Sequence, residues 1–243
     1  MWDRKELKAK GKAAFRANYW KCVIVALILS LLVGGAAAGG SGSMKDATDD
    51  SGEPTFEETF EALTPDEQEV AVKIFAAVIG ALAVFGLIAS VVKILVFNPL
   101  KLGADIFFYR NSEAPAEVGE MLYGFKNGYG RVVLTLFLRD LFTELWMLLF
   151  IVPGVIKALS YSLTPYILAD NPDLSATEAI TLSRKMMNGH KMDVFMLWLS
   201  FIGWMILNAL TCGLVGVFWV NPWMCATDAE VYKTIKAQYV PAE

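Results

Sequence analysis

The sequence is poor in the residues on which catalysis and metal binding most often depend. Its 243 residues include one histidine and three cysteines, Cys22, Cys212 and Cys225, and no two of these cysteines form a C-x-x-C pair. This odd and scattered set argues against a zinc site or a disulfide framework. The sequence also has no H-E-x-x-H, G-x-S-x-G or Walker motif. We therefore expect a protein that is not an enzyme and that has neither a metal site nor a cofactor.

Charged residues are scarce as well, at 19%, whereas 56% of the residues are hydrophobic and the mean hydropathy is +0.47. A soluble domain is typically about 45–50% apolar and about 25% charged. The excess of apolar surface requires lipid, so the bilayer is the expected partner. The membrane surface also explains the basic amino terminus better than nucleic acid does, and we expect no nucleic-acid partner.

Six apolar runs follow one another along the chain. The first, residues 20–38, is long enough at about 1.5 Å per residue to cross a hydrocarbon core of about 30 Å. The sequence therefore predicts an all-α, polytopic integral membrane protein with six transmembrane helices arranged as three hairpins. The fourth and sixth runs are short, and either cross fully or only enter the bilayer. The six runs are residues 20–38, 70–97, 132–152, 155–169, 193–210 and 214–226.

Two turns and one helix start can be predicted from local signals. Pro153 and Gly154 indicate a tight turn between the third and fourth helices, and residues 211–213 a turn between the fifth and sixth. Thr64, Pro65 and Glu67 predict the start of the second membrane helix, because they supply a cap, a first-turn proline and a capping-box acid. The first run, with its basic start, is interpreted as a retained anchor rather than a cleaved signal peptide.

The positive charges predict the orientation. Of the 21 Lys and Arg residues, 16 lie before the first helix, between the second and third, between the fourth and fifth, or in the tail. By the positive-inside rule these segments face the cytoplasm. We expect a multi-pass membrane protein with both termini cytoplasmic. Residues 39–69 contain ten acids and one Lys, Lys45, and form an external acidic loop with a short amphipathic piece carrying Phe56, Phe60 and Leu63.

Amphipathic segments precede the hairpins on the cytoplasmic side. Residues 1–19 place Leu7, Ala14 and Phe15 on one face, next to a row of lysines. A second such helix begins at Ser175, which forms a capping box with Glu178. We expect both helices to lie in the headgroup plane, and the first to bind anionic lipids at the cytoplasmic face.

A threefold pattern relates the hairpins. Five residues after the second helix match five residues after the sixth at identical offsets, and a weaker copy follows the fourth helix, which predicts three repeats of one unit. The prolines should kink the returning helices, and the acids either hold the kinked ends against the next basic helix or bind a ligand. The matching residues are Asn98, Pro99, Asp105, Tyr109 and Arg110; Asn221, Pro222, Asp228, Tyr232 and Lys233; and Pro165 with Asp170.

The repeats define the expected organisation, a single membrane domain over residues 1–243. It begins with the basic helix 1–19, and the first hairpin follows at 20–110 with its acidic loop at 39–69. The second hairpin covers 111–174, and the third, with the cytoplasmic tail, covers 175–243.

One polar cluster lies several turns into the third membrane helix, where Arg139 precedes Asp140 and Glu144. Ionisable groups at such depth usually face protein or water rather than lipid. The two acids are four residues apart and share a helix face. Two interpretations stay open: a proton or cation site, or an internal ion pair in which Arg139 neutralises one acid and fixes helix packing.

Several segments together resemble a known family. Residues 145–172 (LWMLLFIVPGVIKALSYSLTPYILADNP), residues 183–191, the sequence LSFIGW, and the closing NPW and ATDAEVY are similar to the bacterial membrane family called domain of unknown function 975. The repeated unit is also distantly similar to the membrane domain of some glycerophosphodiester phosphodiesterases. The first resemblance implies a six-helix plasma-membrane protein and brings no established activity or site residues.

Two functions fit these observations. The first is a non-enzymatic accessory or scaffold protein for envelope homeostasis or export, with an unidentified membrane protein as partner. The alternative is a small transporter or permease that uses Asp140 and Glu144 as an intramembrane acidic site.

Overall fold

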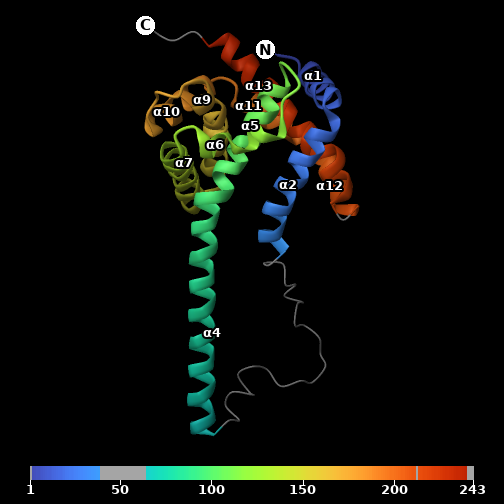
Figure 1. The fold of residues 1–243 in the computed structure, drawn as a ribbon. Helices are drawn as coiled ribbons and strands as arrows, with labels where there is room; N and C mark the ends of the chain where they lie inside the picture. Colours follow the sequence, from blue (N-terminus) through green and yellow to red (C-terminus); the bar gives the residue numbers. More distant parts are fainter. Residues whose placement is uncertain (1, 39–63, 212, 240–243) are drawn as a thin grey trace. The chain divides into compact units, whose positions relative to one another are not determined.

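The computed structural model describes residues 2–38, 64–211 and 213–239, and within them the chain is helical with no strand (Figure 1). The all-α prediction is confirmed. Two compact units are formed: a main unit of residues 1–35 and 94–243, and a second unit of residues 36–93. The α-helices are α1 (Arg4–Ala17), α2 (Tyr19–Ala38), α4 (Pro65–Val92), α5 (Asn98–Asn111), α6 (Tyr123–Lys126), α7 (Tyr129–Leu149), α8 (Ile151–Tyr161), α9 (Thr164–Asp170), α10 (Ala176–Met186), α11 (Lys191–Leu199), α12 (Ile202–Leu210) and α13 (Asn221–Gln238). Two π-helical turns, η1 (Lys93–Phe97) and η3 (Gly216–Val220), and one 3-10 helix, η2 (Val118–Leu122), complete the described elements.

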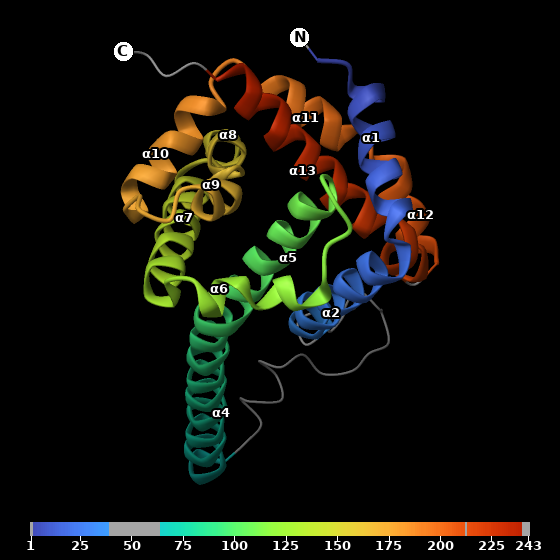
Figure 2. The same cartoon turned by 45° about the horizontal axis from the view of Figure 1, so that its top comes forward.

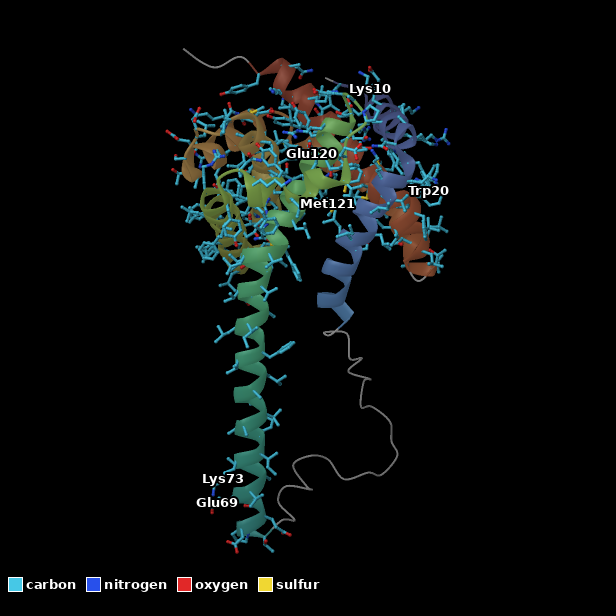
Figure 3. All side chains as sticks on the ribbon, viewed as in Figure 1. Lys10, Trp20, Glu69, Lys73, Glu120 and Met121 are labelled. Atoms are coloured by element: carbon cyan, nitrogen blue, oxygen red, sulfur yellow. The ribbon has the colours of Figure 1, made fainter. Side chains whose placement is uncertain are left out.

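The second unit consists of α4 in the part that the structure describes. Its predicted start is confirmed, since the backbone N–H of Thr64 donates to Glu67 Oε2 at 2.9 Å and Pro65 is the first helical residue. The helix is apolar all round and none of its residues is buried, as expected of a helix whose solvent is lipid. Its polar start carries the Glu69–Lys73 ion pair (Figure 3). The rest of the acidic loop, with Lys45, Phe56, Phe60 and Leu63, lies outside the described residues.

Three helical stretches of the described chain are long and apolar enough to cross a membrane: Pro65–Asn111, Ile151–Asp170 and Lys191–Leu210. A fourth is added if Arg4–Ala17 and Tyr19–Ser30, which meet at a bend of 100°, are taken as one broken span. Helix α7 is long enough, but its four charged residues, Arg131, Arg139, Asp140 and Glu144, make it too polar for this group. The described chain therefore has three or four candidate membrane spans, and a total of six in three hairpins stays a prediction.

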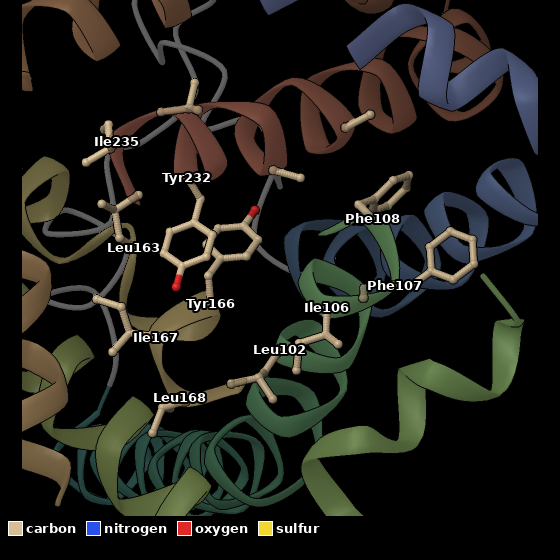
Figure 4. Packing of buried hydrophobic residues seen from close by; sticks show 14 of the residues in the cluster. Leu102, Ile106, Phe107, Phe108, Leu163, Tyr166, Ile167, Leu168, Tyr232 and Ile235 are labelled. Carbon is tan, nitrogen blue, oxygen red and sulfur yellow. The ribbon is translucent and has the colours of Figure 1, made fainter. Parts of the chain in front are cut away.

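The core of the main unit lies around α5 and α13, which cross its middle (Figure 2). Leu102, Ile106 and Phe107 of α5 are buried here, and the rings of Tyr166 from α9 and Tyr232 from α13 stack with centroids 5.0 Å apart (Figure 4). The two central helices come from the matching segments of the first and third predicted repeats.

Both central helices begin in the same way. Asn98 and Pro99 open α5 directly after the π-helical turn η1, and Asn221 and Pro222 open α13 directly after η3. Proline has no N–H to donate, so it is tolerated in the first turn of a new helical segment, and a π turn before it absorbs the irregularity. Pro165 likewise is the second residue of α9, after the break at Ser162 and Leu163. All three prolines thus mark helix starts.

The structure corrects the expected position of the first amphipathic helix. Leu7 and Phe15 are buried by protein, because α1 packs along α13. A Cβ atom at Gly11 would lie 2.8 Å from the Cα of Thr227, so the two backbones touch. The apolar face of α10 is also buried, at Ala179 and Met186. The apolar faces therefore pack on protein instead of resting on lipid, as a buried face can when a partner helix is available.

The predicted turn at Pro153 and Gly154 is also corrected. The chain reverses three residues earlier, at Phe150, whose backbone is extended (φ −156°, ψ 135°) between α7 and α8. Pro153 lies in the first turn of α8, where a missing N–H costs no helical hydrogen bond. Gly154 then lets α8 approach Met147, whose Cα would be 2.7 Å from an added Cβ atom.

Candidate functional site

A cavity of about 860 Å³ lies between the helices of the main unit. Its wall contains five ionisable side chains, two basic and three acidic. They come from α5 (Lys101 and Asp105), α7 (Arg139 and Asp140) and α13 (Asp228). Polar and aromatic residues form part of the remaining wall: Ser30, Thr143, Tyr161, Ser162, Tyr166, Trp198, Asn208 and Asn221.

The fold brings together two groups of residues that the sequence suggested separately. Asp105 and Asp228 occupy the same offset, seven residues after Asn98 and Asn221, on the two central helices. Because α5 and α13 pack together and begin alike, both carboxyl groups face the same space. Lys101 lies one helical turn before Asp105, on the same face of α5. The cavity thus lies where segments of all three predicted repeats meet.

Arg139 and Asp140 form a closed pair at one side of this space. The Nε and Nη2 atoms of Arg139 donate to Asp140 Oδ1 at 2.9 and 2.7 Å, and Asn98 Nδ2 donates to Oδ2 at 2.9 Å. Both carboxylate oxygens therefore have partners, as the ion-pair interpretation requires. Glu144 is exposed and is not among the residues that line the cavity. The predicted trio is thus divided, with two members at the cavity and one outside it.

Asp228 is the acid whose environment is most unusual. Its Oδ1 atom accepts a hydrogen bond of 3.0 Å from the indole N–H of Trp198. Burial raises the pKa of Asp228 to about 7, against the opposing effects of the Trp198 hydrogen bond and of Lys101, and the nearby Asp105 raises it further. This carboxyl group exchanges its proton near neutral pH, which suits a site that binds or releases a cation.

The raised pKa predicts how stability depends on pH. The folded state holds the proton of Asp228 up to about pH 7, whereas the unfolded chain loses it near the ordinary aspartate pKa of 3.8. This group therefore lowers stability as pH rises from about 4 to about 7. The free energy of unfolding of Asp228→Asn relative to wild type should rise over that interval, by on the order of 4 kcal/mol, and stay constant above pH 8. A difference between the two proteins that does not change with pH would contradict the assignment.

Asp170, the acid of the second repeat, lies elsewhere and serves as a structural hub. Its Oδ2 atom accepts hydrogen bonds from Tyr232 Oη at 2.5 Å and from Lys236 Nζ at 2.6 Å, and Tyr109 Oη lies 3.5 Å away. Burial and this hydrogen bond raise the pKa of Tyr232, and the carboxylate raises the pKa of Lys236. Asp170 thereby joins the end of α9 to α13.

The other predicted residues support the walls. Asn221 Nδ2 donates to Ser30 Oγ at 3.3 Å and ties α13 to α2. Pro99 packs closely against Gly124, since an added Cβ atom on Gly124 would lie 2.6 Å from the carbonyl oxygen of Pro99. Pro222 is buried.

The sequence analysis did not identify Lys101 and Trp198 as site residues, although the spacing of Lys101 four residues before Asp105 is a usable signal. No group of three or more His, Cys, Asp or Glu residues suited to a metal occurs in the described ranges.

Comparisons with known proteins agree with the membrane assignment. Residues 147–239 match a family model described as Protein of unknown function (DUF975). The chain is also similar to UPF0259 membrane protein SG1383 of Sodalis glossinidius (strain morsitans), with 27% identity over 179 residues, or 70% of this chain. The alignment spans 66% of that relative, just under two thirds of its length. No solved structure matches the chain.

These matches confirm the resemblance to domain of unknown function 975. They also support a membrane protein of unknown function. Neither match concerns glycerophosphodiester phosphodiesterases, so that similarity stays a prediction.

Proposed function

We propose that this chain, similar to the DUF975 membrane proteins, is a small non-enzymatic permease of the bacterial plasma membrane that carries a small organic cation. The observation that carries the proposal is the cavity itself, in which five ionisable side chains from three helices meet inside a chain with membrane spans. Burying so many charges is costly, and ionisable groups between membrane helices commonly mark substrate or ion pathways. The accessory or scaffold interpretation stays a prediction.

The charge balance favours a cation. Arg139 and Asp140 neutralise each other through two hydrogen bonds. Lys101 then stands against Asp105 and Asp228, which leaves one negative charge when both acids are ionised. Tyr166 and Trp198 also line the wall, and aromatic faces attract cations with about 0.5–2 kcal/mol. A monovalent organic cation would balance the site.

The plasma membrane and cytoplasmic termini belong to the same proposal. Their support is the distribution of Lys and Arg, because 16 of the 21 lie in segments predicted to share one side. Anionic lipid at that side would balance the basic residues 1–19.

The proposal can be tested by flux measurements on the full chain in liposomes. Under an imposed inside-negative potential at pH 8, radiolabelled tetramethylammonium should enter faster than into protein-free liposomes. Asp228→Asn should reduce the protein-dependent rate at least tenfold, because the site loses its net negative charge. Glu144→Gln is the matched control, since Glu144 lies outside the cavity wall, and it should retain more than half of the rate.

Two results would contradict the permease. One is a wild-type rate equal to that of protein-free liposomes. The other is an equal loss in both variants, which would indicate damage to α7 or α13 instead of loss of a site.

A further inference from the structure

Three cationic side chains form a row along α1. Lys8, Lys12 and Arg16 are spaced by four residues, so they lie on one face of the helix. This face is adjacent to the one formed by Leu7, Gly11 and Phe15, which packs on α13. The row therefore lies along the edge of the contact between α1 and α13.

Aromatic rings lie beneath the whole row. Lys8 Nζ is 3.9 Å from the ring centre of Phe201 and 5.4 Å from that of Trp223. Lys12 Nζ is 5.5 Å from Trp219, and the Arg16 guanidinium carbon is also 5.5 Å from Trp219. We call these three cations and three rings the basic shelf. Rings hold the cations in place but leave their charge uncompensated.

The basic shelf contrasts with the other cations of the amino-terminal region. Lys10 pairs with Glu6 at 2.8 Å, and Lys21 pairs with Glu117. Lys8 donates to the carbonyl oxygen and hydroxyl of Ser200, which carry no charge. Within the described ranges, no carboxylate forms an ion pair with Lys8, Lys12 or Arg16, so the row lacks its counter-charge.

An exposed apolar surface continues directly from the shelf. Helix α12 begins at Ile202, next to Phe201, and exposes Met205, Ile206 and Leu210 by 46%, 58% and 77%. Trp204 of the same helix makes an edge contact with Trp223, with ring centres 5.6 Å apart. A cluster of positive charges without an ion-pair partner thus adjoins about two turns of exposed apolar helix. Such a surface is complementary to a lipid that has an anionic headgroup and apolar chains.

We propose that the basic shelf is a specific binding site for one anionic phospholipid. Its phosphate lies between Lys12 and Arg16, near Lys8, and its acyl chains run along α12. The inference depends on the membrane environment and not on the cavity, so failure of the permease proposal leaves it intact. It differs from general attraction to a charged surface, because it assigns the selectivity to one row of side chains.

The test measures lipid preference in the full chain. Purified protein in detergent is titrated with phosphatidylglycerol or with phosphatidylcholine of the same acyl chains, and bound lipid is counted by native mass spectrometry. Wild type should prefer phosphatidylglycerol about tenfold or more, since three cations attract one anionic headgroup together. K12Q/R16Q should remove most of this preference, and K12R should keep it.

The matched control is K5Q/K10Q, which removes the same charge from exposed positions of the same helix. It should retain at least a third of the preference. An equal loss of lipid preference in both double variants would show diffuse electrostatic attraction instead of a specific site. Full preference in K12Q/R16Q would also overturn the assignment. If glycerol phosphate displaces the lipid at equal concentration, the site takes a free anion instead and the proposal fails.

Discussion

Replacing Gly103 by alanine should lower the free energy of unfolding of the main unit by about 2–3 kcal/mol. In the middle of α5, an added Cβ atom would lie 1.9 Å from the carbonyl oxygen and 2.4 Å from the carbonyl carbon of Met121. These are backbone atoms, which cannot rotate away as a flexible side chain can. Helix α5 would have to separate from η2, and its buried face at Leu102 and Ile106 would lose packing.

The control is Gly203→Ala in α12, also in the main unit, where no atom lies within 4 Å of the added Cβ. Alanine favours helix over glycine by about 1 kcal/mol, so this variant should be unchanged or slightly stabilised. Thermal unfolding in detergent, followed by tryptophan fluorescence, compares the two. Equal stability of Gly103→Ala and Gly203→Ala would show that α5 and η2 are less tightly packed than the structure indicates.

Most local signals in the sequence predicted local structure, although the turn expected at Pro153 and Gly154 lies at Phe150. The Asn-Gly pairs before the third and fifth predicted helices correspond to the same backbone conformation, since Gly128 and Gly189 have φ of 67° and 87°. Such positive φ values favour glycine, which has no Cβ atom. The matching Asn-Pro pairs likewise gave matching helix starts after π turns. Signals that act within four or five residues can be recognised without knowledge of the fold.

The candidate site could be predicted only in pieces. Asp105 and Asp228 were recognised as equivalent, and Arg139 was grouped with Asp140 and Glu144, but nothing in the sequence indicates that α5, α7 and α13 enclose one space. Helical periodicity places Asp140 and Glu144 on one face, yet it does not say how far along that face the neighbouring helices reach. Glu144 was therefore grouped with the site although it lies beyond the cavity wall.

The same limit explains the error at α1. An apolar face on a helix predicts burial but not the partner that buries it, and membrane lipid was one possible partner. The face carries Gly11, and a helix with a glycine in its apolar face is suited to close contact with another backbone, here that of Thr227. Gly11 was therefore the available sign that the apolar face of α1 packs on protein and not on lipid.

Replacing Asp170 by alanine should lower the free energy of unfolding by about 2–3 kcal/mol. The reason is that three donors on two helices, α5 and α13, share this one carboxylate. Tyr232 is 1% exposed, so its hydroxyl would stay buried without an acceptor, at a cost of about 1–3 kcal/mol. The Lys236 ion pair adds less, since the lysine side chain is 49% exposed and water screens it. Because α13 also lines the cavity, release of its carboxyl-terminal half should reduce cation flux as well as stability.

Asp173→Ala serves as the control, since Asp173 is an exposed acid three residues further along the chain, and its thermal stability should match that of wild type. The two contributions to the hub can be separated by Tyr232→Phe and Lys236→Ala. Once Tyr232→Phe has removed the buried hydroxyl, Asp170→Ala should cost less than about half of what it costs in wild type. If Lys236→Ala is instead as damaging as Asp170→Ala, the ion pair and not the buried tyrosine holds α9 to α13.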